Sequence, residues 1–160
     1  MKKIIRGLGA SMVLLAFART TNAMGIFQSD VGYIPMPMIN ISLTLTDNLG
    51  VMTTVEHGSI DGKDYITGYD GLILNVIPLK NIASISFTKT TNTPAALMEK
   101  LDNNPLKAVI QLRNNTTLTI IVDGSLICFG KTPYGYVRIK LAMIDRIDSI
   151  RRIGTAKDHQ

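Results

Sequence analysis

The sequence predicts an all-β fold with two tandem small β-barrel or roll repeats, joined by one short helix, after a cleaved N-terminal signal. Three observations predict it. Apolar and polar residues alternate over most of the chain, turn residues separate the alternating runs, and residues 62–85 resemble residues 124–147. The length of 160 residues suits one ordinary domain or two very small ones.

The composition excludes several classes of protein. With 46% apolar residues, the chain has enough apolar surface for a core, so it is not a disordered tail. Its single cysteine excludes a disulfide framework and a thiolate-rich metal site, and two histidines leave little for metal binding. We therefore expect neither a metal nor another cofactor.

Residues 1–23 have the features of a secretory signal. Three cations within residues 2–6 precede the uncharged run Gly7–Ala18, which is too short to cross a bilayer as a helix. Small residues at Thr21-Asn22-Ala23 predict cleavage after Ala23, and Ala16-Phe17-Ala18 is an earlier alternative. We expect a periplasmic or secreted protein with no transmembrane segment in the mature chain.

Removal of this signal changes the charge of the protein. The formal net charge of +5 falls to +1, because four of the cations lie within residues 1–23. The remaining charge is uneven, with −3 on residues 24–90 and +4 on residues 91–160. This asymmetry indicates either docking between charged surfaces or an anionic partner.

Strands are predicted throughout residues 39–90, which we interpret as β repeat 1. An Asp-Gly pair at Asp70-Gly71 predicts a hairpin, and Pro78 predicts the end of a strand or an edge position because proline has no backbone N–H. The predicted strands span residues 39–46, 51–56, 65–67, 72–77 and 82–87.

A helical linker is predicted at residues 91–105. Thr93 is the expected N-cap, Pro94 occupies the first turn, residues 95–101 favour a helix, and Asp102–Pro105 end it. Beyond the linker, residues 106–153 form β repeat 2, and residues 154–160 are a flexible tail. The strands expected in this repeat span residues 108–112, 118–122, 126–129, 136–141 and 144–150.

The tandem repeat is predicted from an alignment that places residues 62–85 over residues 124–147. Six identities result, and they fall on turn glycines and on a shared Ile/Leu spacing. A slightly different alignment pairs Asp47-Asn48 with Arg113-Asn114 as the first turn of each repeat. The identical pairs are Gly62/Gly124, Gly68/Gly130, Ile77/Ile139, Leu79/Leu141, Ile82/Ile144 and Ile85/Ile147.

Residues 130–147 read GKTPYGYVRIKLAMIDRI and resemble the end of a small β module of bacterial envelope proteins. Residues 68–85 are a degenerate version of the same pattern, with Pro78 inside it. The resemblance implies a strand order similar to that of Sm-like or SH3-like small barrels. The loop residues with which Sm proteins contact RNA have no counterpart here, so no nucleic-acid partner is implied.

Catalytic residues are not evident in the sequence. Cys128 is the one nucleophile to weigh, but it lies between Ile127 and Phe129 and aligns with Ile66, which favours a core position. His57 is interpreted as a solvated turn residue, and the acids Asp61, Asp64 and Asp70 lack calcium-loop spacing. We predict a protein that is not an enzyme, with a Cys128-dependent enzyme as the rival hypothesis.

Two surfaces are candidates for binding. The extended arm at residues 24–38 carries Pro35 and Pro37, and its apolar side chains are costly to leave in water, so it covers an edge of its own barrel or binds a partner. The residues expected to bind a partner are Phe27, Tyr33, Ile34, Met36 and Met38.

The second surface is one face of a predicted strand. Tyr136, Arg138 and Lys140 share that face and suit a phosphate, a lipid headgroup or an acidic protein, unless they are an ordinary solvated face. Arg146, Arg151 and Arg152 are further cations that would extend it.

The sequence therefore predicts a non-catalytic exported β protein that mediates protein–protein interaction, as a subunit of a bacterial envelope assembly or by self-association. Binding of an anionic ligand or lipid headgroup, with a peripheral membrane or cell-wall contact, is the alternative.

Overall fold

The computed structural model describes residues 37, 40–102 and 104–152, and the side chains of residues 149–152 are not among what it describes. All of these residues belong to one compact unit. The signal and the tail therefore lie outside the described residues, and their assignments stay predictions.

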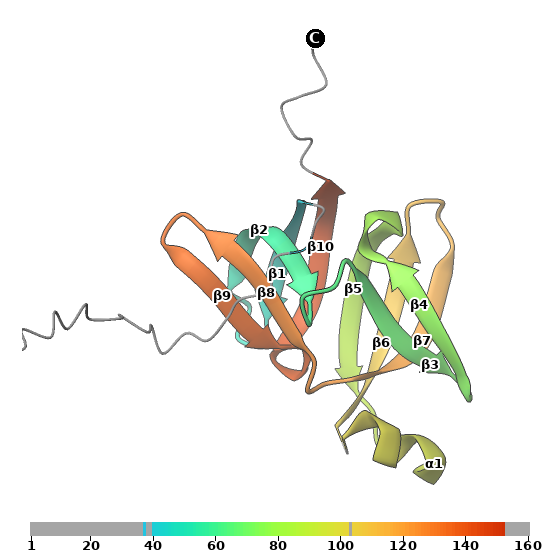
Figure 1. Ribbon diagram of the computed structural model, residues 1–160. Coiled ribbons are helices and arrows are strands. Elements are labelled where there is room, and N and C mark those ends of the chain that lie inside the picture. Colours follow the sequence, from blue (N-terminus) through green and yellow to red (C-terminus); the bar gives the residue numbers. More distant parts are fainter. Residues whose placement is uncertain (1–36, 38–39, 103, 153–160) are drawn as a thin grey trace, which may run out of the picture. The chain divides into compact units, whose positions relative to one another are not determined.

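The described chain is mostly β structure, as predicted (Figure 1). All ten predicted strands are present, and most are a few residues longer than the alternating pattern indicated. They are β1 (Ile41–Asp47), β2 (Met52–Ile60), β3 (Tyr65–Asp70), β4 (Ile73–Pro78), β5 (Ile82–Lys89), β6 (Pro105–Leu112), β7 (Thr117–Asp123), β8 (Ile127–Thr132), β9 (Gly135–Lys140) and β10 (Ile144–Arg152).

The ten strands form one antiparallel sheet in the order β4-β3-β7-β6-β5-β10-β1-β2-β8-β9. Strands from the two halves of the chain are therefore interleaved. One half-sheet contains β10, β1, β2, β8 and β9, and the other contains β5, β6, β7, β3 and β4, as Figure 1 shows on its two sides. Each half-sheet takes two strands from one half of the chain and three from the other.

The two half-sheets join where β5 pairs with β10, with Ile85 directly opposite Ile147. Several elements on the two sides of this junction have matching boundaries. The pairs are β3 and β8, β4 and β9, and the 3-10 helices η1 (Leu79–Asn81) and η3 (Leu141–Met143). The backbone bonds also recur, since Leu79 N–H donates to Asp64 O and Leu141 N–H donates to Leu126 O, both at 2.8 Å.

The first hairpins also correspond, but one position away from the predicted alignment. Asp47 N–H donates to Val51 O and Leu112 N–H donates to Thr116 O, so Asp47 is equivalent to Leu112 and not to Arg113. The left-handed residue of each turn agrees, at Gly50 and Asn115. The alignment by residue identity was therefore wrong by one position. Backbone hydrogen bonds, and not residue types, define the equivalent turn positions.

Gly68 and Gly130 are not turn glycines, in contrast to the prediction. Both lie buried within strands, β3 and β8. A Cβ on Gly130 would lie 2.4 Å from Cβ of Val55, and one on Gly68 would lie 2.6 Å from Cδ1 of Ile120. A side chain at either position would therefore clash with residues of the neighbouring strand in the sheet.

The predicted helix is present between β5 and β6 as α1 (Ala95–Met98) followed by η2 (Glu99–Leu101). Its N-cap is Pro94 and not Thr93, whose hydroxyl makes no capping bond. Asp102, in the left-handed conformation, ends the helix. Leu97 and Leu101 are buried, so the apolar face of this short helix packs against the protein.

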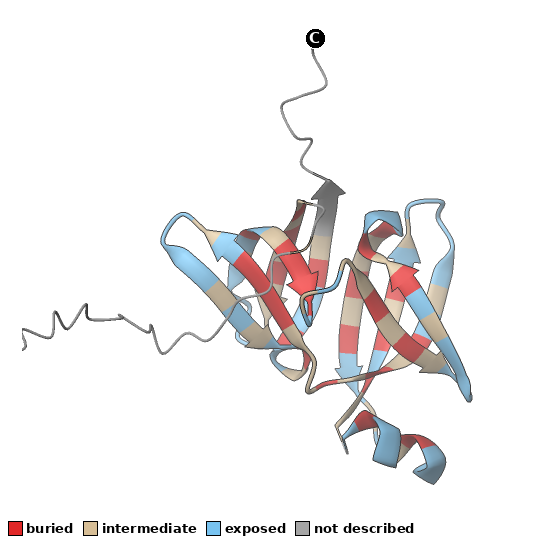
Figure 2. Cartoon of the chain, viewed as in Figure 1, coloured by how far each residue is buried: buried red, intermediate tan, exposed pale blue. Residues whose placement is uncertain are grey.

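The core consists of one cluster of buried, mostly aliphatic side chains. Figure 2 shows buried residues in strands of both half-sheets. The repeated Ile/Leu spacing faces inward: Ile77, Leu79 and Leu141 are buried, and Ile139 packs against the cluster while partly exposed. The predicted inward orientation of this spacing is confirmed, and both half-sheets depend on a single core.

Candidate interaction surfaces at the sheet edges

The sheet ends in two open edge strands, β4 and β9, neither of which has a second neighbour among the described strands. They occupy equivalent places, because each is the second strand of a tight hairpin, β3–β4 or β8–β9. An open edge presents unpaired backbone N–H and C=O groups, to which another strand can bind. Figure 2 shows much of both strands as exposed.

The β9 edge carries the three residues predicted to bind an anion. Tyr136, Arg138 and Lys140 are all exposed, and their alternation in β9 places them on one face. Lys131 of β8 lies opposite Tyr136 and adds a fourth polar side chain to that face. The Arg138 guanidinium lies over the Phe129 ring, 5.8 Å from its centre, in a cation–π contact.

Of the other predicted cations, Arg146 does not join this surface. Arg146 lies on β10, which three strands separate from β9 in the sheet order, and its guanidinium forms an ion pair with Asp148. The side chains of Arg151 and Arg152 are outside the described part of the structure, as are the arm residues Phe27, Tyr33, Ile34, Met36 and Met38. The partner-binding role of the arm therefore stays a prediction.

The β4 edge was not singled out from the sequence, and it carries several large apolar side chains that are exposed. Leu72 in the preceding turn is 67% exposed, and Ile73, Leu74 and Val76 are 71%, 52% and 56% exposed. No residue of β4 is charged. Pro78 was the available signal, since proline within a strand favours an edge.

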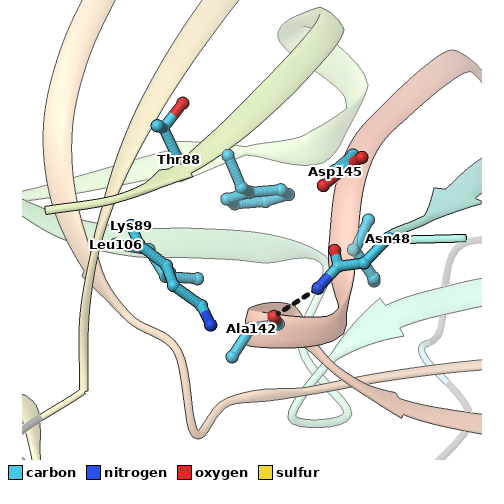
Figure 3. A pocket seen from close by; sticks show the side chains of 8 residues that line it. Asn48, Thr88, Lys89, Leu106, Ala142 and Asp145 are labelled. Atoms are coloured by element: carbon cyan, nitrogen blue, oxygen red, sulfur yellow. Dashed lines mark hydrogen bonds between the residues drawn. The ribbon is translucent and has the colours of Figure 1, made fainter.

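A shallow hollow of about 320 Å³ lies between the ends of β5 and β10 (Figure 3). Asn48 lies at its rim and donates from Nδ2 to Ala142 O at 3.1 Å. Lys89 and Asp145 line it from opposite sides (Figure 3). The buried Phe87 also contributes to its lining. These groups form no nucleophile–base pair, so the hollow offers packing and polar contacts but no evident chemistry.

No match was found when the chain was compared with family models, with curated proteins and with solved structures. What the protein does must therefore follow from its own residues and their surroundings.

Cys128 lies in the core, as predicted. It is fully buried on β8, opposite Ile60 of β2 and Ile139 of β9. Burial raises the pKa of its thiol to about 12. A thiol with that pKa stays protonated at neutral pH and is a poor nucleophile.

His57 is placed differently from the prediction. It lies within β2 and not in a turn, at an irregularity where the pairing with β8 shifts between Glu56 and Ser59. Its φ of 52° marks a β-bulge, and its backbone N–H donates to Oδ1 of Asn40 at 2.9 Å. The bulge lets Gly58 approach the side chain of Leu43.

Of the three acids predicted to be turn residues, Asp61 has a structural role. Asp61 is left-handed and its Oδ1 accepts from Ile127 N–H at 2.9 Å. Among the described residues, no group of three His, Cys, Asp or Glu side chains is arranged to hold a metal. Within the same ranges, every helix is too short or too polar to cross a bilayer.

Proposed function

We propose that the protein is a non-catalytic, exported protein that mediates protein–protein interaction through the open edges of its sheet, as a subunit of a bacterial envelope assembly. The observation that carries this proposal is the uncharged, exposed β4 edge at the end of a ten-stranded sheet. Edge strands usually carry charges, bulges or covers that prevent pairing with other chains. An edge without them is suited to strand addition.

The surroundings of Cys128 support a non-catalytic role. The one cysteine is fully buried and its thiol has a raised pKa, which leaves the rival Cys128-dependent enzyme without an accessible thiolate.

Export is part of the proposal and depends on sequence alone. The charge order and the short apolar run of residues 1–23 support removal after Ala23. Release of a chain that begins at Met24 from the periplasm of a bacterial host, by osmotic shock, tests it. Retention in the cytoplasm of a chain with residues 1–23 intact would contradict it.

We further propose that residues 39–90 and 106–153 are two copies of one five-stranded unit related to small-barrel modules. The matching boundaries and backbone bonds on either side of the β5–β10 junction support this relationship. In this arrangement the copies exchange strands, because the first two strands of each pair with the last three of the other.

Site-specific photo-crosslinking tests the interaction role. A benzophenone side chain is introduced at Leu74 on the β4 edge, at Tyr136 on the β9 edge, or at Leu49, an exposed turn residue that serves as control. Irradiation of bacterial envelopes should give discrete adducts from Leu74 or Tyr136 and none from Leu49. Absence of adducts from both edges would contradict the proposed function.

Binding of an anionic ligand is a second candidate, favoured by the exposed cations beside β9. Arg138, Lys140 and Lys131 share one face, and no described carboxylate forms an ion pair with them. Vesicles of anionic lipid should then bind the protein at low salt and release it at high salt, since exposed charge contacts are screened. The double variant Arg138→Gln/Lys140→Gln should lose this binding, and Lys80→Gln/Lys107→Gln should retain it.

A further inference from the structure

The β4 edge is apolar, as protein–protein interfaces often are, yet no other described strand pairs with it. Ile73, Leu74 and Val76 are each more than half exposed, in a strand whose residues include no charge. At the equivalent edge in the second half of the chain, Tyr136 stands in place of Leu74, Arg138 in place of Val76 and Lys140 in place of Pro78. The two edges are thus equivalent in the fold and opposite in chemistry.

The hairpin geometry determines which backbone groups of β4 are free. Asp70 and Ile73 flank a two-residue turn, in which Gly71 has a φ of 58°, and such a flanking pair exchanges two hydrogen bonds. The N–H and C=O groups of Ile73, Asn75 and Ile77 therefore point to β3. Those of Leu74 and Val76 point to the open edge, and Pro78 has no N–H to continue it.

We propose that the β4 edge binds the β4 edge of a second copy of this chain, as an antiparallel pair related by a two-fold axis. This inference rests on the proposed interaction role and names its partner. The pairing uses all four outward groups when Leu74 lies opposite Val76 of the other copy. Asn75 then lies on the two-fold axis, facing its own equivalent.

Charge favours this partner over the alternatives. Two β4 edges bring no like charges together, whereas two β9 edges would oppose Arg138 and Lys140 to the same cations of the other copy. Pairing of β4 with β9 of another copy would leave a free edge at each end and extend into a fibre, whereas the two-fold pair is closed. The junction of the two half-sheets already has the same form, with Ile85 and Ile147 paired antiparallel at equivalent positions.

Sedimentation velocity of the purified full chain over a range of concentrations tests the proposal. We expect a reversible dimer. Val76→Lys should weaken dimerisation by about tenfold or more, because it adds two like charges and removes apolar contact across the axis. Leu49→Lys, at an exposed turn residue, should leave it unchanged.

Charge pairing makes the test specific. In the proposed register the two residues at position 76 are diagonal neighbours on one face, within reach of long side chains. Mixing Val76→Lys with Val76→Glu should therefore restore the dimerisation that is weakened in each variant alone. Mixing Leu49→Lys with Leu49→Glu should add nothing to the association of the parent chain.

A disulfide provides an independent measurement. Directly opposite residues at a non-hydrogen-bonded site have Cα atoms about 4.5 Å apart, which a disulfide can bridge. Asn75→Cys should oxidise to a covalent dimer, while the buried Cys128 stays reduced. Met143→Cys, exposed on η3, should not cross-link in the same way.

The outcomes separate this inference from the proposed function. A chain that stays monomeric and an Asn75→Cys variant that does not cross-link would overturn the β4 pairing. So would fibres whose growth requires β9, or a dimer that Val76→Lys leaves intact. Adducts of Leu74 with a different envelope protein would also overturn it, yet would leave the interaction role standing.

Discussion

Ile85 and Ile147 face each other across β5 and β10, both fully buried, and they are also residues that the repeat alignment equates. Equivalent residues lie directly opposite each other only near an axis of two-fold symmetry. The proposed repeat would therefore place a pseudo-two-fold axis at the centre of the sheet, between these two residues. The two half-sheets are related through this pair.

The first prediction concerns this pair. Ile85→Ala and Ile147→Ala should each lower the free energy of unfolding by about 2–5 kcal/mol, and by similar amounts, since each leaves an equivalent cavity. Urea unfolding measures the change, and Met143→Ala, at an exposed residue, should have little effect. A cost at one position only would argue against equivalent packing.

Unfolding should occur in a single transition for all of these variants. Because β1 and β2 pair with β10 and β8, and β6 and β7 pair with β5 and β3, neither half of the chain holds a complete half-sheet. Circular dichroism and amide hydrogen exchange should therefore report one cooperative unfolding event. Two separated transitions would contradict the interleaved sheet.

The second prediction concerns a pair of equivalent side-chain hydrogen bonds. Nδ2 of Asn48 donates to Ala142 O at 3.1 Å, and Nε of Arg113 donates to Lys80 O at 2.9 Å. Each bond ties the first turn of one half of the chain to the 3-10 helix of the other half. Asn48→Ala and Arg113→Ala should each cost about 0.5–1.5 kcal/mol in urea unfolding, and Lys107→Ala, an exposed strand residue, almost nothing.

Local sequence patterns predicted the individual strands of this fold well. They did not predict which strands pair with each other in the sheet. Alternation such as that of residues 39–46 indicates a strand with one buried face, which follows from neighbouring residues alone. Which strand lies beside β1 depends on residues far along the chain, such as Ile147 opposite Leu45, and no local pattern encodes that. For this reason, the interleaving of strands from the two halves could not be predicted from the sequence.

The same limit applies to the candidate surfaces. The common face of Tyr136, Arg138 and Lys140 follows from alternation and was predicted, and the structure places all three on one exposed face. Residues 72–77 are nearly continuously apolar, which usually indicates a strand buried on both faces, yet β4 lies at an edge. Such a conflict between local pattern and position is expected at sites with a function.

The third prediction concerns the two strand glycines. Gly130→Ala should destabilise the protein more than Gly68→Ala, both by about 1–3 kcal/mol or more. The new Cβ at position 130 would lie 2.4 Å from Cβ of Val55, which is fixed to the backbone, whereas at position 68 the fixed atom it meets is the backbone O of Ile121, at 2.9 Å. Thermal unfolding measures the order, with Thr119→Ala, exposed on β7, as control. Equal and small effects would contradict the close approach.

The fourth prediction concerns pH. Burial raises the pKa of the Cys128 thiol from 9.0 to about 12, so between these values the unfolded chain loses its thiol proton while the folded chain retains it. The contribution of this thiol to the free energy of unfolding is therefore fully present below pH 9. It is lost as the pH rises toward 12, at up to about 1.4 kcal/mol per pH unit.

The variant Cys128→Ala isolates this contribution. This variant should be less stable than the parent chain at neutral pH, because the substitution leaves a small cavity. Its stability should not fall at high pH through ionisation of the thiol. Urea unfolding of both chains at about pH 8 and about pH 10.5 should show their difference shrinking, while the titrations of tyrosine and lysine cancel in the comparison. A constant difference would mean that the thiol is not desolvated in the folded protein, as would rapid modification of Cys128 by a thiol reagent without denaturant.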